Sequence, residues 1–527
     1  MAQNWDMKTF MKGASILTIS AIVVKILSAV YRVPYQNMVG DKGFYIYQQV
    51  YPFIGIFIIW TSYGFAVSVS KLLASEINGG RKTAILKISL VYLLMISSLF
   101  FIILMIFAPT FASAMGDAEL TPLLRAGAFI VLVMPFLAVL KGSFQSTGQM
   151  IPVAVSNVGE QASRVLIVLF GTWLVMTSGA SLYRAGEVAM WGAVVGEAVG
   201  VLILAFYYRN AVREPAVKVA KWPIIKELTI VSLSVSASSL ILLFFQLIDS
   251  FTVLNMLFDA GMEEEAAMAL KGVYDRGQPL VQMGILIATT LALAIVPLIS
   301  HHATREEGRG AYPFIKVTYR VAFLFGSAAT VGLMLVLPFV NEMLFETKTG
   351  SIALIVFVIQ IFWLSLLLPL TAILQGAGKI KIPTLLFAIG VLTKWIGNAF
   401  LVEKFSILGA AISGNISFML IVLGIVLYFK HVYPIRLAPS RFYKWTGLGL
   451  LAMTATVLTW IYLCSQLPIT NISLRLQSTM IGLTAVLLGA AVFLWIILKA
   501  RILQDNEWHL LPFGKRLARV QQRLHRK

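Results

Sequence analysis

The stretch Ile16–Gly43, ILTISAIVVKILSAVYRVPYQNMVGDKG, is apolar enough to enter a bilayer, yet it contains Lys25 and Arg32. These two cations are seven residues apart, so a helix places them on one face. A charge near the bilayer centre costs roughly 3 kcal/mol on insertion scales, which favours a face that points into protein or water. The stretch therefore predicts a helix lining a cavity that receives an anion. For Arg32, near the end of the run, snorkelling to the headgroups is an open alternative.

The composition indicates a membrane protein. The chain has 527 residues, of which 59% are hydrophobic and 12% charged, and its mean hydropathy is +0.87. Soluble domains carry about 25% charged residues. We expect an all-α polytopic protein whose first apolar segment is a membrane helix, with no removable signal peptide. The one cysteine, Cys464, excludes an intrachain disulfide, and the five histidines lie in predicted connections or the tail, so we expect no metal cofactor.

Hydrophobic segments alternate with connections of different charge. We count fourteen segments, at residues 11–34, 46–69, 88–109, 123–144, 153–176, 187–208, 230–256, 276–299, 318–340, 352–374, 384–402, 407–429, 445–464 and 478–498. Alternate connections are basic, which predicts that the N- and C-termini are both cytoplasmic. The net charge of +19 is therefore a topology signal, and nucleic acid is excluded as its explanation.

Short motifs recur at nearly one spacing. Lys42–Tyr45 recurs as Lys271–Tyr274 at a spacing of 229, and Gln145 recurs as Gln375 at 230. Each repeat holds six segments, so we expect two lobes in parallel pseudo-two-fold arrangement. The predicted boundaries are an N-terminal lobe 1–210, a cytoplasmic linker 211–229, a C-terminal lobe 230–432, an additional helix pair 441–500 and a basic tail 501–527.

Further charged residues lie inside predicted segments. Arg164 and Lys394 are separated by 230 residues, so the repeat places a cation at matching depth in each lobe. Glu160 precedes Arg164 by four residues, a spacing at which the two can pair on one helical face. The pair can be a substrate site or a structural ion pair. Glu197 and Asp249 can be salt-bridge partners or sites that bind H⁺ or Na⁺ during transport.

The segment Gln145–Val165, QSTGQMIPVAVSNVGEQASRV, resembles a known family. With the opening cation-bearing helix, it is similar to the multidrug/oligosaccharidyl-lipid/polysaccharide (MOP) exporter superfamily, in the branch of polysaccharide biosynthesis, stage V sporulation and lipid II flippase proteins. The Glu-Gln-x-x-Arg element of that branch stands here as Glu160, Gln161 and Arg164. Lys25 occupies a position where these relatives often have arginine.

The resemblance implies alternating access around a cationic cavity that takes the headgroup of a polyprenyl-(di)phosphate-linked saccharide. Its implied substrate-binding residues are Lys25, Arg32, Glu160, Gln161, Arg164 and Lys394. Coupling to H⁺, Na⁺ or the membrane potential and a monomeric state are the accompanying expectations. A cation-coupled multidrug antiporter is the nearest alternative. A membrane glycosyltransferase or ligase is another, but the predicted outer connections are too short for a catalytic domain, so we expect no enzyme.

The tail carries an amphipathic pattern. Phe513, Leu517, Val520 and Leu524 form a stripe at helical spacing, surrounded by basic residues at 515, 516, 519, 523 and 526. This predicts a helix in the plane of the membrane surface that binds anionic phospholipid. A solvated basic tail is the alternative.

Overall fold

The computed structural model describes residues 7–209, 214–286, 288–290, 312–379, 381–432, 436–466, 473–508 and 514–525. Within these ranges every regular element is a helix and no strand occurs. Ten helices in the described part are long and apolar enough to cross a membrane. The predicted all-α polytopic fold is therefore confirmed, while the count of fourteen spans stays a prediction.

The chain forms two compact units, Met1–Asp275 and Arg276–Lys527. This division falls later than the predicted linker at 211–229. The reason is that helices α8 (Lys221–Asp259) and α9 (Glu264–Asp275), which follow the linker, pack on α2 (Arg32–Ile59) in the first unit. The six-plus-six repeat itself stays a prediction.

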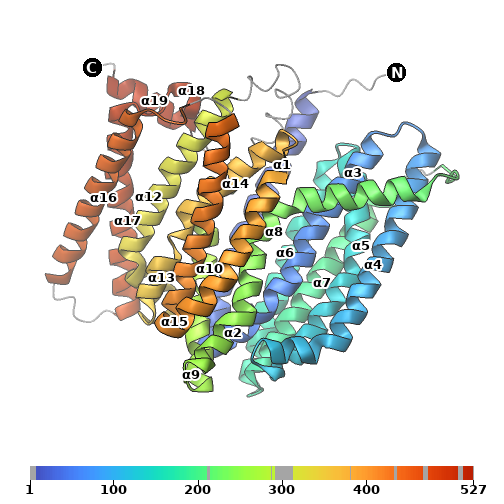
Figure 1. Ribbon diagram of the computed structural model, residues 1–527, viewed down its shortest axis with the longest axis horizontal. Coiled ribbons are helices and arrows are strands. Elements are labelled where there is room, and N and C mark those ends of the chain that lie inside the picture. The colour runs from blue at the N-terminus through green and yellow to red at the C-terminus, as the bar shows by residue number, and fades with distance from the viewer. Residues whose placement is uncertain are drawn as a thin grey trace. The chain divides into compact units, whose positions relative to one another are not determined.

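The first unit is a helical bundle (Figure 1). Helices α6 and α7 pack extensively on each other, α5 packs on both α4 and α7, and α1 packs on α6. The elements besides those already given are α1 (Met7–Val30), η1 (Trp60–Phe65, a π-helix), α3 (Ala66–Ala74), α4 (Gly79–Ala114), η2 (Ala118–Leu120), α5 (Thr121–Ser146), α6 (Met150–Thr177) and α7 (Leu182–Tyr208).

A sharp bend interrupts α2. Gly40 has φ 69° and ψ −172°, a conformation that a side chain would strain, so the two parts of α2 run in different directions. On the other side of the bend, Gly272 of α9 lies so close to Asp41 that an added Cβ would overlap the Asp41 carbonyl group. The stretch Ile16–Gly43 therefore comprises most of α1 and the first part of α2, and it includes this bend.

The second unit is also helical, and its elements are α10 (Gly277–Gly284), α12 (Tyr312–Phe345), α13 (Ser351–Phe357), α14 (Gln360–Gly376), α15 (Lys381–Val432), α16 (Ser440–Gln466), α17 (Leu474–Ala500), α18 (Asp505–Trp508) and α19 (Gly514–His525). Two predicted segments, 384–402 and 407–429, lie in α15, which bends at Ser406, where φ is 55°. Helix α12 packs on α16 and α17 around Phe442, Met453 and Phe493.

Candidate functional site

Arg32 lies at the start of α2 and is only 1% exposed. Its guanidinium carbon lies 4.8 Å from the centre of the Tyr51 ring, a cation–π contact across the bend of α2. Its Nε and Nη1 atoms have no hydrogen-bond partner, and the side chain forms no ion pair with any residue that the structure describes. This burial agrees with an interior-facing Arg32 and not with a side chain snorkelling to the protein surface.

Four tyrosines lie together in this region, Tyr31 at the junction of α1 and α2 and the others on α2. The hydroxyl oxygens of Tyr31 and Tyr47 are 2.6 Å apart and hydrogen-bonded. The ring centres of Tyr35 and Tyr47 are 5.1 Å apart, and those of Tyr47 and Tyr51 are 5.8 Å apart. We call Arg32, Tyr31, Tyr35, Tyr47 and Tyr51 the arginine–tyrosine cluster. It combines a charged donor with phenolic hydroxyl groups, which suits oxygen-rich ligands.

Arg164 of α6 lies in the same region, because α6 packs on α2 and Tyr31, Tyr47 and Tyr51 of the cluster are near its guanidinium group. Its Nη2 donates a hydrogen bond of 2.8 Å to Oε1 of Glu197 on α7. Its Nε has no hydrogen-bond partner among the described residues. The structure thus brings Arg32 and Arg164, two of the predicted cations, to one buried site in the first unit.

Glu160 pairs with a different cation from the one that its spacing suggested. Its carboxylate lies 2.9 Å from Nζ of Lys141 on α5 and accepts a hydrogen bond of 2.6 Å from Ser156. The predicted option of a Glu160–Arg164 ion pair is therefore wrong. Residues four apart on a helix can pair, but here neighbouring helices supply buried partners for both.

Lys141, Glu160, Arg164 and Glu197 form what we call the charged quartet, two cations and two carboxylates in two ion pairs that are all buried. The two pairs are also close to each other, since the charges of Glu160 and Lys141 act electrostatically on the Glu197 carboxyl group. The quartet is neutral as a whole. Arg32 lies outside it and forms no ion pair with a described residue; the carboxylate of Asp275, which pairs with Lys271, interacts with Arg32 only through its electrostatic field.

Glycines let α7 approach the quartet. A Cβ at Gly200 would overlap Cγ and Oε1 of Glu160, and a Cβ at Gly196 would lie 2.7 Å from the Glu160 carbonyl oxygen and 3.1 Å from Cβ of Arg164. The carbonyl of Gly200 also accepts a hydrogen bond of 3.2 Å from Ser156. The small residues are therefore needed where α6 and α7 enclose the ion pairs.

Replacing Gly200 by alanine is expected to lower the melting temperature, because the added methyl group forces Glu160 away from Lys141 at a cost of about 1–3 kcal/mol. Fluorescence-detected size-exclusion chromatography after heating measures this. The control is Gly332→Ala in α12, where nothing lies within 4 Å of an added Cβ. Equal melting temperatures for both variants and the wild type would contradict the tight contact.

Lys25 and Gln161 lie on α1 and α6, which pack against each other. Lys25 is half-buried and forms no ion pair with a described residue. Gln161 is buried, and its Nε2 has no hydrogen-bond partner within the described ranges. Both therefore keep polar groups available inside the first unit, and their predicted role in binding substrate stays a prediction.

Lys394 lies in the second unit, on the first part of α15. It is buried, and its Nζ donates a hydrogen bond of 2.9 Å to the carbonyl of Ala410, on the other side of the bend at Ser406. Ser413 donates to the Lys394 carbonyl at 3.0 Å. Lys394 thus joins the two parts of α15, and its role toward substrate stays a prediction.

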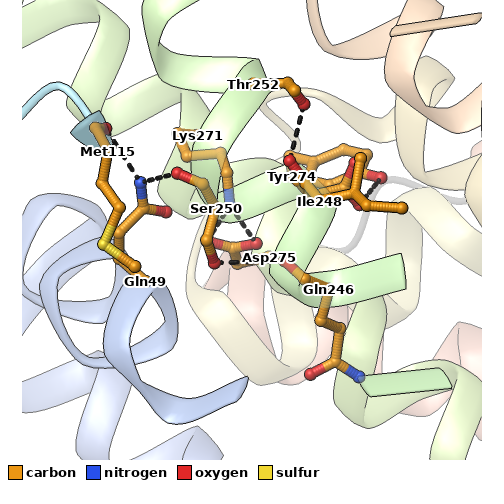
Figure 2. Close-up of polar contacts among 10 residues, drawn as sticks. Gln49, Met115, Gln246, Ile248, Ser250, Thr252, Lys271, Tyr274 and Asp275 are labelled. Carbon is orange, nitrogen blue, oxygen red and sulfur yellow. Dashed lines mark hydrogen bonds and ion pairs between the residues drawn. The ribbon is translucent and has the colours of Figure 1, made fainter. Parts of the chain in front are cut away.

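Asp249 of α8 is buried and accepts a hydrogen bond of 2.8 Å from the hydroxyl of Tyr274. Figure 2 shows Tyr274 near a second buried pair, Lys271 with Asp275, whose atoms are 2.7 Å apart. Gln49 of α2 donates to the carbonyl of Met115, in the turn after α4, and to that of Ser250 on α8, and so joins these parts of the first unit (Figure 2). Ion coupling through Asp249 or Glu197 stays a prediction.

The motif Lys42–Tyr45 and its repeat Lys271–Tyr274 each place a tyrosine next to a buried aspartate. Tyr274 donates to Asp249, and Tyr45 donates to Asp117 at 3.1 Å. Tyr183 donates to the same Asp117 oxygen at 2.8 Å. Asp117 lies in the connection between α4 and α5, and burial raises the pKa of its carboxyl group. In both copies of the motif, the tyrosine hydroxyl thus donates a hydrogen bond to a buried aspartate.

Sequence reasoning missed several members of these sites. Lys141 stands near the end of a predicted segment, where a lysine indicates topology more readily than a buried pair. The tyrosines did leave a signal, because Tyr31 and Tyr35, like Tyr47 and Tyr51, are four residues apart. The described part of the chain contains no group of three or more His, Cys, Asp or Glu side chains that could hold a metal ion.

Comparisons with known proteins agree with this architecture. The pattern of the family described as polysaccharide biosynthesis protein matches residues 10–302. The chain is 37% identical over 520 residues to YabM, an uncharacterized membrane protein of Bacillus subtilis, covering 97% of this chain and 96% of the relative. It is 23% identical to the lipid II flippase MurJ of the same organism, covering 95% of this chain and 97% of MurJ.

Among solved structures, lipid II flippase MurJ in an inward closed conformation matches with a TM-score of 0.68 at 14% identity, covering 90% of this chain and 98% of that one. At this identity the structural match shows the fold alone. Together the findings show that the chain is a multi-pass membrane protein and that it belongs to the polysaccharide biosynthesis protein family of the MOP exporter superfamily.

Proposed function

We propose that the chain is an alternating-access flippase that moves a polyprenyl-(di)phosphate-linked saccharide, a lipid II-like precursor, from the inner to the outer leaflet of a bacterial plasma membrane. In this proposal both termini are cytoplasmic. The observation that carries it is Arg32, a buried cation with unpaired donors and no carboxylate partner among the described residues. The named functions of related proteins, such as the lipid II flippase, point the same way.

The free-energy cost of burying the Arg32 charge explains why this site favours an anionic ligand. Taking an ion out of water costs several kcal/mol even after relaxation, and removing the neutralising partner of a buried charge is strongly destabilising. The Tyr51 ring offsets part of this cost, since a desolvated cation–π contact contributes about 2 kcal/mol. A phosphate group would supply the missing charge and accept hydrogen bonds from two guanidinium nitrogens at once.

For the other predicted substrate-binding residues of the first unit, we infer a role from the contacts that each side chain makes. Arg164 remains bonded to Glu197 and has its Nε left to donate, so it can hold a second phosphate oxygen without losing its counter-charge. Gln161 has a free amide donor that suits a saccharide hydroxyl group, and Lys25 adds a positive charge on the neighbouring helix. Glu160 acts indirectly, by neutralising Lys141.

Coupling to an ion would act through the same network. Glu197 holds Arg164, so binding of H⁺ to Glu197 would weaken that ion pair and change how Arg164 meets the substrate. Asp249 is the second candidate, through its bond with Tyr274. Membrane potential is the third source of energy that a charged substrate permits.

A multidrug antiporter is the competing function, and the charges argue against it. A cationic drug needs a carboxylate that is not already neutralised, yet Glu160 and Glu197 are both paired with buried cations. Arg32 would also repel such a drug. The region therefore favours an anionic headgroup over a cationic ligand.

Complementation of a bacterial strain depleted of its lipid II flippase tests the proposal. We expect rescue by the wild-type chain and no rescue by an Arg32 variant that reaches the membrane in equal amount. If the wild type does not rescue, proteoliposomes carrying other polyprenyl-diphosphate saccharides test the substrate class directly. Drug–cation exchange in the same proteoliposomes, without translocation of any of these lipids, would overturn the proposal.

A further inference from the structure

The C-terminal helix α19 is docked on the second unit through one of its faces. Trp508 of α18 is fully buried, and its indole nitrogen donates a hydrogen bond of 2.9 Å to Oε1 of Gln521. Gln521 in turn donates to the carbonyl of Leu503 at 3.1 Å, and Ala518 is buried beside it. Helix α19 therefore has a fixed place at the end of α17 (Figure 1).

The opposite face of α19 is exposed and carries two kinds of side chain. Arg516 and Arg523 are exposed basic residues, while Val520 and Leu524 are exposed apolar residues, 44% and 42% respectively. The spacings of three, four and seven residues place all of them on one side of a helix. The apolar stripe predicted from the sequence is thus divided. Val520 and Leu524 are exposed, and Leu517 is half-buried against the protein. Its fourth member, Phe513, lies outside the described residues.

The surroundings of α19 have the features of a membrane–water boundary. Helix α17 is a candidate span, and near its C-terminal end the exposed Trp495 ring lies 4.8 Å from Nζ of Lys499. The first turns of α16 also expose Trp445, and Arg441 donates from there to the carbonyl of Ala500 at 3.1 Å. Exposed tryptophans with neighbouring cations are typical of the headgroup level.

Glu507, the acid near α19 whose side chain the structure describes, does not neutralise this outer face. Glu507 is itself buried and paired with Arg320, at 3.0 Å, so its charge is already used inside the protein. The outer face of α19 therefore keeps its positive charge next to two exposed apolar side chains at the level of the headgroups.

We propose that this outer face binds the headgroups of anionic phospholipids, with Val520 and Leu524 inserted among the upper acyl-chain carbons. The docked face fixes α19 to the end of α17, so lipid binding holds the α16–α17 pair at a set depth in the membrane. Anionic lipid fits better than a protein partner, because basic residues flank apolar ones at a boundary where acidic headgroups are abundant.

Binding of a fluorescent phosphatidylglycerol to the purified full-length protein in detergent tests this. The double variant Arg516→Gln, Arg523→Gln is expected to bind at least about tenfold more weakly, since each basic residue near such a surface contributes appreciably to binding. The matched control is Lys218→Gln, Lys221→Gln, which removes two exposed charges from the first unit. Equal weakening in both variants, or none in the tail variant, would overturn the proposal.

A second measurement does not depend on those arginines. The chain's one cysteine, Cys464, allows a Cys464→Ala background in which Val520→Cys carries a spin label. In phosphatidylglycerol membranes we expect the label to be reached by oxygen from the bilayer more readily than by a water-soluble nickel reagent. A label that only the nickel reagent reaches would show a solvated tail and refute the lipid contact.

Discussion

Replacing Arg32 by methionine is expected to reduce transport by at least about 100-fold while leaving thermal stability unchanged or raised. The loss follows because two charge-assisted hydrogen bonds to a phosphate, worth about 1.5–3 kcal/mol each, disappear with the guanidinium group. Stability should not fall, because the variant no longer buries a charge that lacks an ion-pair partner among the described residues, and it fills similar space with an apolar side chain. Translocation in proteoliposomes and melting in detergent measure the two effects separately.

Two further variants sharpen this test. Arg32→Lys keeps the charge but not the planar fork, so its transport should be intermediate. The control is Arg184→Met, since the Arg184 side chain is 67% exposed and paired with Glu187 on the surface of α7. If Arg32→Met melted well below the wild type, the side chain would be structural, and near-normal transport by this variant would remove Arg32 from the substrate site.

Replacing Glu197 by glutamine is expected to lower the free energy of unfolding by about 3–5 kcal/mol, because it leaves Arg164 charged and buried without its carboxylate partner. The variant should therefore melt at a clearly lower temperature in detergent. Transport should fall as well, since Arg164 would lose the contact that orients it next to the arginine–tyrosine cluster.

The chain offers a matched control for this variant on the same helix. Glu187 also pairs with an arginine at 2.7 Å, but that pair is at the surface, so Glu187→Gln should cost less than about 1 kcal/mol. The double variant Arg164→Met, Glu197→Met should regain most of the lost stability without regaining transport. A similar melting temperature for the Glu197 and Glu187 variants would contradict the larger contribution to stability that we expect from the buried Arg164–Glu197 pair.

The sequence alone determined the class, an all-α membrane protein. Long apolar runs in a chain that is only 12% charged have no stable place except a membrane, and backbone groups in a membrane must be satisfied within helices. The same reasoning identified Arg32 as a residue to explain, because a charge within such a run is costly wherever it lies. These conclusions depend on composition and local spacing, which a sequence shows directly.

Only the tertiary structure decided which charges meet. The i, i+4 spacing made Glu160 and Arg164 possible partners. In the structure α6 packs on both α5 and α7, so Glu160 pairs with Lys141 of α5 and Arg164 pairs with Glu197 of α7. The bend at Gly40 brought Tyr51 over Arg32, from nineteen positions along the chain. Ion pairing and burial depend on distances between helices remote in sequence, and a local pattern does not contain those distances.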